Sequence, residues 1–322
     1  MLVLDCLIEI QGKSNKIKFT YVNSIEVNTS IRNLTDTAKV VFPRKTNMKG
    51  KKLNKFIKRG DEISIYAGYK DIDWQNIFNG YITGVSSETP IRIEAENEMW
   101  KLKQIRVNPS RYDKFKLKEF LSEYAPDVEL LMPEDIEFGE VIIQEETTVA
   151  KVLDYLKQNY PFNAFFDGKK MVAVMLTSQL PLNRVVKFKK GLNIISDTLK
   201  YTLAEDVNIQ IVAKSILPDN SKLESKKGDK NGEVCTFYAP QYKTQKELDN
   251  YAQEMLSTYK VDKMSGNFTA FGIPFVKKGD KVFLFDDDNK ERNEKKFIAD
   301  AVKYGFSEKG YRQTVTLGDE IK

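Results

Sequence analysis

The chain has 322 residues, 41% hydrophobic and 30% charged, which is typical of a folded protein with two or three domains. It contains no histidine, which excludes Ser-His-Asp and Cys-His nucleophiles, histidine-ligated zinc and imidazole proton shuttles. Two cysteines, Cys6 and Cys235, are too few for a disulfide framework, so we expect free thiols in a reducing compartment. The net charge of +5 is milder than the clustered excess typical of nucleic-acid-binding proteins.

Nothing in the sequence predicts a membrane span or an exported precursor. No apolar run approaches the roughly 20 residues that a membrane helix needs. The N-terminal segment lacks the basic start of a signal peptide and carries Asp5 inside its short apolar run. We therefore expect synthesis in the cytoplasm.

Residues 1–100 are predicted to form a first β domain. Apolar and polar residues alternate from Leu2 to Ile10, and further strands are predicted at 21–31 and 35–42. The next stretch, 44–59, carries eight basic residues and no acidic ones: Arg44, Lys45, Lys49, Lys51, Lys52, Lys55, Lys58 and Arg59. Such a run is usually a solvated loop. The functional alternative is a contact surface for an acidic partner, either nucleic acid or protein.

Residues 101–185 are predicted to form an α+β domain. A short amphipathic helix is expected at 116–124, and Thr148 has the position of an N-cap before a longer helix that Pro161 stops. Asp167-Gly168 is a strong hairpin signal. It joins two of the three strands that we predict here, at 141–143, 163–166 and 170–176.

Residues 186–322 are predicted to form a second β domain. Strands are expected at 186–188, 199–203 and 207–216, followed by a polar stretch at 218–233 that we interpret as a hairpin arm. Thr244 and Glu247 have the spacing of a capping box, which predicts one helix at about 244–260.

An internal repeat relates the two β domains. Phe275–Phe285 repeats Phe56–Tyr66 by residue class, and their Gly-Asp turns are 279 − 60 = 219 residues apart. In the next strand Phe297 matches Phe78 and Gly305 matches Gly84. A third alternating strand closes each unit, with Ile91, Ile93 and Ala95 in the first copy and Val315 and Leu317 in the second. A turn with three strands in common register indicates duplication of one small antiparallel β-barrel. The predicted fold is therefore mainly β, with two such barrels and an α+β domain between them.

No reaction centre can be assembled from the sequence. Glu94, Glu96 and Glu98 alternate on a predicted strand and could imitate the carboxylate pair of a glycan hydrolase. We interpret them as charged residues on an exposed sheet edge, where they discourage aggregation. Glycine-rich phosphate loops and metal-ligand spacings are absent from the sequence. We therefore predict a protein without enzymatic activity, metal or cofactor.

Several short motifs together resemble one protein family. They are Asn33–Ala38 leading into Val40–Pro43, Arg59–Ile65, the capped helix Thr148–Leu156 followed by Ala164–Gly168, and the closing Gly279-Asp280 unit. This layout resembles the tail baseplate hub proteins of contractile phages, also called the late-control protein D family. It is also similar to the N-terminal half of type VI secretion spike proteins.

The resemblance implies a structural role. Three chains with two barrels each would form a ring with pseudo-sixfold symmetry, adapting the sixfold tail tube to a threefold spike. The implied partners are the chain itself as a homotrimer, the tail tube protein, a central spike protein, and DNA or tape-measure protein in the lumen. The implied location is the virion tail, assembled in the bacterial host cytoplasm. Because the sequence ends at Lys322 with the second barrel, the spike and any lysozyme domain are expected on separate polypeptides.

Two other functions remain open from the sequence alone. One is a nucleic-acid-binding β-barrel protein that uses the 44–59 loop, for which affinity should depend steeply on salt. The other is a carboxylate-based cell-wall glycan hydrolase that depends on Glu94 and Glu96.

Overall fold

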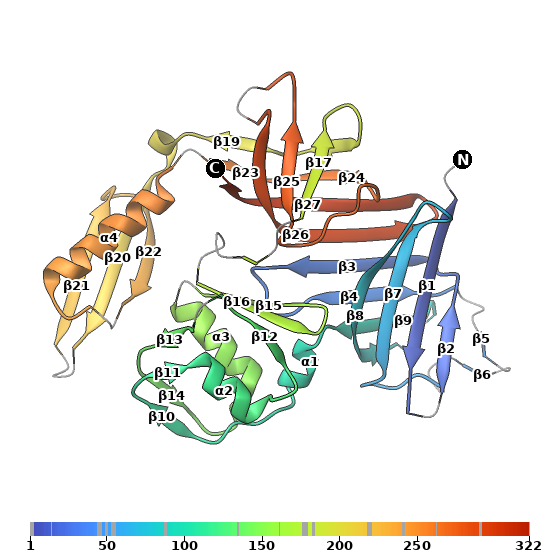
Figure 1. Ribbon diagram of the computed structural model, residues 1–322, viewed down its shortest axis with the longest axis horizontal. Coiled ribbons are helices and arrows are strands. Elements are labelled where there is room, and N and C mark those ends of the chain that lie inside the picture. Colours follow the sequence, from blue (N-terminus) through green and yellow to red (C-terminus); the bar gives the residue numbers. More distant parts are fainter. Residues whose placement is uncertain are drawn as a thin grey trace.

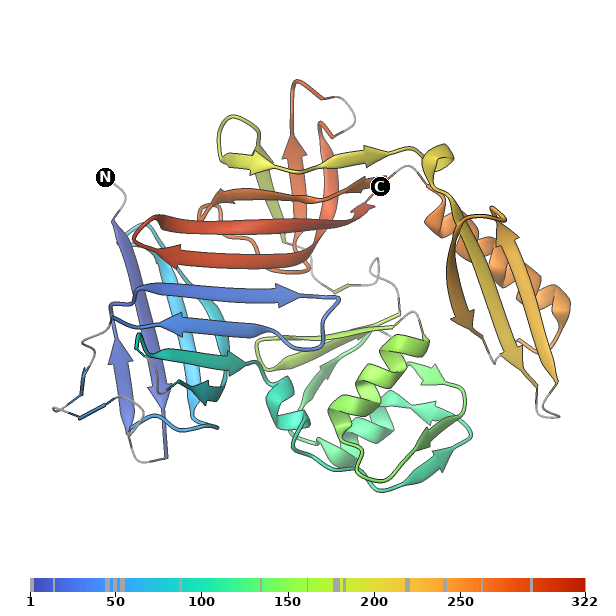
Figure 2. The same ribbon diagram turned by 180° about the vertical axis from the view of Figure 1, so that it is seen from behind.

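The computed structural model describes residues 3–321 except 14, 44–46, 49–50, 53–55, 87–88, 134, 161, 176–179, 182–183, 218–220, 240–241, 262 and 290–291. Strands make up 51% of the structure and helices 14%, which confirms the predicted mainly β class. Figures 1 and 2 show two sheet-rich parts stacked against each other, an α+β domain beside them, and a smaller lobe apart from both.

Thirteen strands form one continuous sheet. They are β1 (Leu4–Gln11), β2 (Lys16–Phe19), β3 (Ser24–Ser30), β4 (Thr37–Val41), β7 (Glu62–Tyr69), β8 (Asp73–Val85), β9 (Arg92–Glu96), β17 (Val185–Lys189), β18 (Ile194–Asp197), β24 (Asn267–Phe271), β25 (Lys281–Phe285), β26 (Lys295–Ser307) and β27 (Gly310–Ile321). The order is β18-β24-β27-β26-β3-β4-β9-β8-β7-β1-β2, with β25 pairing β26 and β17 pairing β25. We call β1–β4 with β7–β9 the first β-unit, and β17, β18 with β24–β27 the second β-unit.

Alternating apolar residues explain why these strands share a core. In β1, Cys6, Ile8 and Ile10 are buried while their neighbours are more exposed, as the predicted alternation requires. Burial raises the pKa of the Cys6 thiol to about 11, so this free cysteine is a packing residue. The buried apolar residues of both β-units form a single cluster rather than two.

The duplicated turns have the same geometry. In Lys58–Asp61 and in Lys277–Asp280, the aspartate side chain accepts a hydrogen bond from the first lysine amide, at 2.8 and 2.7 Å. The glycines have φ of +90° and +83°, a backbone region that other residues rarely adopt. Each glycine amide donates to a carbonyl in the second strand after its turn. Gly60 donates to Ile82 of β8 and Gly279 to Ala299 of β26, both at 2.7 Å. These contacts confirm the internal duplication at its turn.

The sequence comparison missed the register of the second strand after each turn, β8 in the first copy and β26 in the second. Phe297 lies opposite Val282, and the equivalent position opposite Ile63 is Gly80 rather than Phe78. The match of Phe78 with Phe297 is therefore wrong by two residues. A shift of two keeps the side chain on the same face of the sheet. The Phe78 ring reaches back over Gly80, because an added Cβ there would lie 2.9 Å from the ring.

A third strand closes each unit, as predicted, but the glycines matched in the strand before it are not equivalent. The pairing of β8 with β9 has a bulge between Ile82 and Gly84, and that of β26 with β27 has one between Ala299 and Ala301. The shared bulge makes Ala301, not Gly305, the equivalent of Gly84. Beyond it the pairing resumes in both copies, with Val315 of β27 in the place of Ile93 of β9.

The α+β domain has its own hydrophobic cluster. It contains α1 (Met99–Leu102), α2 (Leu117–Tyr124), α3 (Val149–Asn159), β10 (Ser110–Tyr112), β11 (Phe115–Lys116), β12 (Glu129–Leu131), β13 (Glu137–Phe138), β14 (Val141–Ile143), β15 (Asn163–Asp167) and β16 (Lys170–Val174). Thr148 caps α3, as predicted, by accepting from the Lys151 amide at 3.4 Å. The predicted strand at 141–143 is present as β14, which pairs with β10, whereas β12 is the strand that joins β16.

The lobe apart from the β-units is an insertion between β18 and β24. It contains β20 (Ile209–Ile216), β21 (Lys222–Gly228), β22 (Glu233–Tyr238) and α4 (Gln245–Tyr259), and we call it the side lobe. Thr244 and Glu247 form the predicted capping box. The described part of the polar 218–233 stretch is largely β21, which pairs with β20 as a hairpin arm. The remaining elements are β5 (Asn47–Met48), β6 (Lys51–Lys52), β19 (Lys200–Thr202), β23 (Lys263–Ser265) and a 3-10 helix (Ala204–Asp206).

The side lobe has a separate small core. Leu248, Tyr251 and Ala252 of α4 are buried in it against β20. The helix predicted within the second barrel domain is therefore present but packs in this lobe. The domain boundaries at 100 and 185 stay predictions.

The repeated turns generate a first prediction. Gly60→Ala and Gly279→Ala should each lower the free energy of unfolding by about 1 to 2 kcal/mol, because alanine is strained at their positive φ. Urea denaturation followed by tryptophan fluorescence measures the change. Gly305→Ala is the matched control, since its backbone is not at positive φ and nothing lies within 4 Å of an added Cβ. Equal loss in all three variants would contradict the prediction.

Candidate functional site

The two β-units are joined edge to edge by β3 and β26. Seven residue pairs connect these antiparallel strands, from Ser30 opposite Ala301 to Ser24 opposite Ser307. The Thr29 hydroxyl adds a hydrogen bond of 2.9 Å to the Val302 carbonyl. We call this pairing the unit junction. It places two copies of one structural unit in a fixed relation within a single chain.

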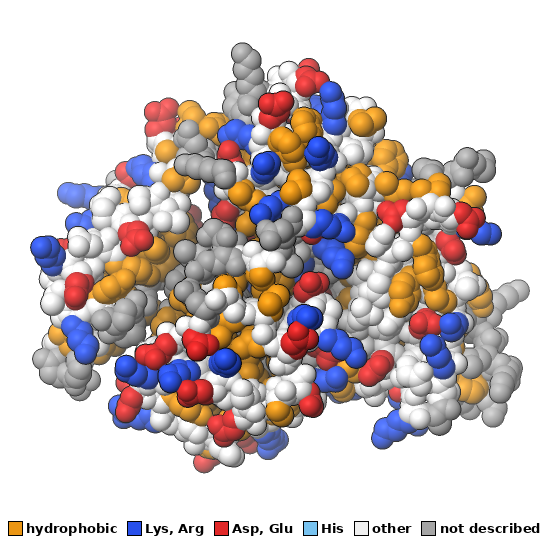
Figure 3. Space-filling model, viewed as in Figure 1, with side chains coloured by type: hydrophobic (Ala, Val, Ile, Leu, Met, Phe, Trp, Pro, Cys, Tyr) orange, Lys and Arg blue, Asp and Glu red, His pale blue; other side chains and the backbone are white. Residues whose placement is uncertain are grey.

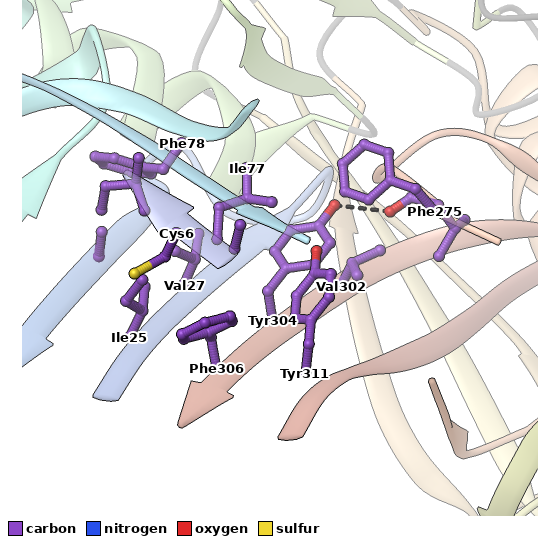
Figure 4. Close-up of a cluster of buried hydrophobic side chains, with 14 of the residues drawn as sticks. Cys6, Ile25, Val27, Ile77, Phe78, Phe275, Val302, Tyr304, Phe306 and Tyr311 are labelled. Atoms are coloured by element: carbon purple, nitrogen blue, oxygen red, sulfur yellow. Dashed lines mark hydrogen bonds between the residues drawn. The ribbon is translucent and has the colours of Figure 1, made fainter. Parts of the chain in front are cut away.

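Buried side chains fill the space beneath the unit junction (Figure 4). Tyr304 of β26 is buried, stacks on Phe275 at 5.5 Å between ring centroids, and donates to the Val276 carbonyl at 2.7 Å. Tyr69 of the first β-unit donates to the Tyr311 carbonyl of the second at 3.4 Å. Burial raises the pKa of Tyr304 well above its ordinary value, so its hydroxyl remains protonated and can keep donating. The junction is therefore a shared core as well as a strand pairing.

A buried ion pair crosses the unit junction. Lys278, in the duplicated turn of the second β-unit, places its Nζ 2.6 Å from the Asp36 carboxylate at the end of the β3–β4 connection. Both side chains are only 8% exposed. Asp36 also accepts from the Ser30 amide and from Asn97 Nδ2, each at 3.1 Å. All of these donors converge on one carboxylate, as a buried charge requires.

The same ion pair contacts the α+β domain. Lys278 Nζ lies 4.9 Å from the ring centroid of Phe165 in β15, within the range of a cation–π interaction. A cavity of about 150 Å³ lies beside the pair, lined by residues of both β-units and of the β15–β16 hairpin. Lys278 and Asp36 thus lie where three parts of the chain meet.

Burial acts against the charged forms of both partners. It lowers the pKa of Lys278 and raises the pKa of Asp36, and in each case the charge of the other residue opposes the shift. Such a pair gains little net stability compared with apolar residues of the same volume, but removing one partner leaves an uncompensated buried charge. The pair therefore specifies how the three parts fit together.

The sequence analysis did not predict the ion pair of Lys278 with Asp36. Both repeat copies carry a basic residue before the Gly-Asp turn, Arg59 in the first and Lys278 in the second. Arg59 is exposed, whereas Lys278 is buried. The only available signal is the lack of an equivalent basic loop around Lys278, which sets that lysine apart from the surface run at 44–59.

The predicted basic loop lies partly outside the described residues. Lys51 and Lys52 form β6, which pairs with β5, and both Lys58 and Arg59 are exposed in the first repeat turn. The other four predicted contact residues, Arg44, Lys45, Lys49 and Lys55, fall in the undescribed segments. A role of this loop in partner binding stays a prediction.

The predicted acidic strand does not lie at a sheet edge. β9 pairs with β4 on one side and β8 on the other, so our interpretation of Glu94 and its neighbours as edge residues is wrong. Glu96 forms an ion pair with Lys103 at 2.7 Å, and Glu98 forms one with Lys101 at 3.1 Å. Two of the three carboxylates thus form ion pairs with lysines of α1 and its C-cap.

Comparison with known proteins identifies the fold. No protein-family model matches the chain, and no curated protein sequence matches it. The structure is similar to a tail protein from Neisseria meningitidis MC58, with a TM-score of 0.68 and 11% identity, covering 98% of this chain and 97% of that one. The 43 kDa tail protein of prophage MuSo2 from Shewanella oneidensis gives a TM-score of 0.66, with the same identity and coverages.

A third similar structure comes from a secretion system. The E. coli c3393 protein, a component of the type VI secretion system with structural similarity to T4 bacteriophage tail proteins, gives a TM-score of 0.59. Its identity is 12%, and the match covers 96% of this chain and 76% of that one. The chain thus has the fold of phage tail and type VI secretion proteins, which confirms the resemblance in fold. In the described part of the chain, no helix is long and apolar enough to cross a membrane.

The buried ion pair generates a second prediction. Asp36→Asn should lower the free energy of unfolding by about 3 to 5 kcal/mol, because it leaves the Lys278 ammonium buried without its counter-charge. The double variant Asp36→Leu with Lys278→Met should recover most of that loss, since no charge then remains to be buried. Urea denaturation at neutral pH measures both.

Glu26→Gln supplies the matched control. Glu26 of β3 pairs with Lys303 of β26 at 3.0 Å across the same junction, but both side chains are about half exposed. Its loss should cost less than about 1 kcal/mol. A similar cost for Glu26→Gln and Asp36→Asn would contradict the role given to the buried pair.

Proposed function

We propose that this chain is a non-enzymatic structural hub of a phage tail baseplate, or of a related contractile injection machine, and that it works as a homotrimeric ring. The observation that carries the proposal is the unit junction, which fixes two copies of one β-unit side by side in each chain. In a pseudo-sixfold ring of three chains, each chain must supply two such β-units. The fold shared with phage tail and type VI secretion proteins supports the same role.

The ring would close by repeating the unit junction between chains. β18 is the counterpart of β3 in the second β-unit. β3 pairs antiparallel with β4, which lies beside β9. In the same way β18 pairs antiparallel with β24, which lies beside β27. Among the described residues, β24 is the only strand that pairs with β18, and the other edge of β18 carries only the isolated bridge of Ile194 with Lys190. Past the shared bulge, Gly84 and Val85 of β8 pair with β9 on one side only. We propose that β18 of one chain lies beside this end of β8 in the next.

Exposed apolar residues favour this edge as a contact surface. Leu192 is 73% exposed before β18, and Ile195 within it is 44% exposed. Natural sheets usually protect such edges with charges, so an apolar edge indicates a strand that is covered in the assembly. Figure 3 shows further apolar side chains over β17 and β25, where Val185 is exposed.

Three chains would present six similar β-units to the sixfold tail tube. Features that occur once per chain, such as the α+β domain, the side lobe and the 44–59 loop, would keep threefold symmetry and suit a threefold spike. In this proposal the spike is a separate protein, DNA or tape-measure protein passes through the lumen, and the assembled chain is part of the virion. The basic loop would then face an acidic neighbour rather than act as an independent nucleic-acid-binding site.

The oligomeric state tests the proposal. Light scattering after size exclusion, over a range of concentrations and with the cognate spike added, should give a species three times the 37.1 kDa mass of the chain. Closure should strengthen with concentration or with the spike, because each interchain contact is a strand edge. A dimer under both conditions, or a monomer that never closes with its spike, would overturn the hub assignment.

A paired variant tests the proposed edge. Ile195→Lys should shift the equilibrium towards monomer by about tenfold, because a buried interchain strand position would receive an unpaired charge. Val234→Lys on β22 of the side lobe is the matched control, since Val234 is 59% exposed and lies on a different surface. Equal effects of the two variants would contradict the placement of the interface at β18.

A further inference from the structure

A cleft with a basic rim lies between the first β-unit and the α+β domain. Its volume is about 820 Å³. The β3–β4 connection lines one side of it, and α1 with α3 lines the other. The cleft does not belong to the unit junction or to the proposed ring edge, so an inference about it is independent of the trimer.

Four basic residues and one acidic residue line this cleft, and acidic side chains outside the lining pair with two of the four. The basic residues are Arg32, Lys103, Lys151 and Lys157, and the acidic residue is Asp154. Arg32 pairs with Asp300 at 2.9 Å, and Lys103 pairs with Glu96 at 2.7 Å. The other two ammonium groups have uncharged partners. Lys151 donates to the Glu146 carbonyl at 3.4 Å, and Lys157 donates to the Arg32 carbonyl.

Lys157 is the most constrained of these cations. It projects from the last part of α3 towards Arg32, and it is half-buried. Burial, together with the positive charge of Arg32, lowers the pKa of Lys157 to about 8. An anionic group placed in the cleft would offset that cost, because an opposite charge nearby favours the protonated amine.

The floor of the cleft is apolar. Met99 and Ala150 are buried in the core of the α+β domain, and Leu34 packs against the same cluster. An apolar floor has no hydrogen-bond donors for a bare anion, but an apolar side chain can pack against it. The volume leads to the same conclusion, because it is in the range of clefts that hold ligands of several hundred daltons. One phosphate ion would leave most of the cleft filled with water.

We propose that this cleft docks an acidic peptide segment of a partner protein, in which Asp or Glu residues flank an apolar residue. The apolar side chain would lie on Leu34, which is partly exposed, and the carboxylates would reach Lys151 and Lys157 at the rim. Charge complementarity of this kind gives orientation and speed of association in addition to affinity.

Binding of a defined probe to the full chain tests the proposal. The probe is a fluorescein-labelled peptide of sequence Glu-Asp-Leu-Glu-Asp, followed by fluorescence anisotropy at low and physiological salt. We expect saturable binding that weakens with salt, as for any contact between exposed charges. A peptide with Ser in place of Leu should bind about tenfold more weakly. Equal binding of the Ser peptide, or no binding up to about 1 mM, would overturn the proposal.

Variants locate the binding and separate it from general attraction to a basic protein. Lys151→Glu should weaken binding of the Leu peptide about tenfold, and Lys157→Gln should weaken it while keeping a donor for the Arg32 carbonyl. Lys118→Glu, an exposed position on α2, is the matched control and should change the affinity less than about twofold. Equal weakening at position 118 would overturn the assignment to this cleft.

Lysine reactivity provides a second measurement that does not depend on a variant. Acetylation by a water-soluble succinimidyl ester, followed by mass spectrometry of each lysine, should be slowed by the Leu peptide at Lys151 and Lys157 but not at Lys118. Inorganic phosphate at the same concentration should not give this protection. If phosphate protects both lysines as well as the peptide does, the cleft is a simple anion site and the peptide proposal is wrong.

Discussion

The buried pair of Lys278 and Asp36 is the constraint on which the arrangement of the chain depends. Each β-unit could in principle fold around its own apolar face, but only one relative placement gives the Lys278 ammonium its carboxylate. Other placements would leave a charge buried without a partner, at a cost comparable to a large part of a domain's stability. The pair also contacts Asn97 and Phe165, so it holds the start and the end of the α+β domain in the same position. Its main effect is specificity of arrangement rather than added stability.

Duplication followed by divergence explains why only one copy can make this contact. The two turns have the same hydrogen bonds and the same positive φ at glycine. What differs is the strand that follows. Past the bulge, β26 pairs with both β27 and β3, whereas β8 ends at Val85 with β9 on one side. Both strands have 13 residues, but β26 continues further past its bulge and pairs there with β3, and Lys278 of the second turn is buried against the β3–β4 connection. In the first copy Arg59 is exposed, and the described residues place no such neighbour against it.

The sequence predicted the elements well where one local rule decides the structure. Period-two alternation gave β1, the capping residues Thr148 and Thr244 gave α3 and α4, and Asp167-Gly168 gave the β15–β16 hairpin. It failed where the decision is tertiary. The register of β8 differs by two residues from the class-by-class match, because Gly80, where an added Cβ would lie 2.1 Å from the Glu96 carbonyl, occupies the place of Phe297. The partner of β14 and the burial of Lys278 depend on elements distant in sequence, and the basic cleft joins the β3–β4 connection to helices that begin more than 60 residues later. Each of these is a contact between segments whose local patterns are unremarkable.

The unit junction also bears on how a ring could assemble. Association costs translational and rotational freedom for every body that is immobilised, whatever contacts are made. Six separate β-units would incur that loss five times, whereas three fused pairs incur it twice. This reduction requires the two β-units of a chain to keep a fixed relation. Tyr304, Tyr69 and the buried ion pair all cross or line the junction and hold the units together. Weak strand edges between chains can then suffice for closure. In the proposed ring, a duplicated unit within one chain would therefore lower the cost of closing the ring.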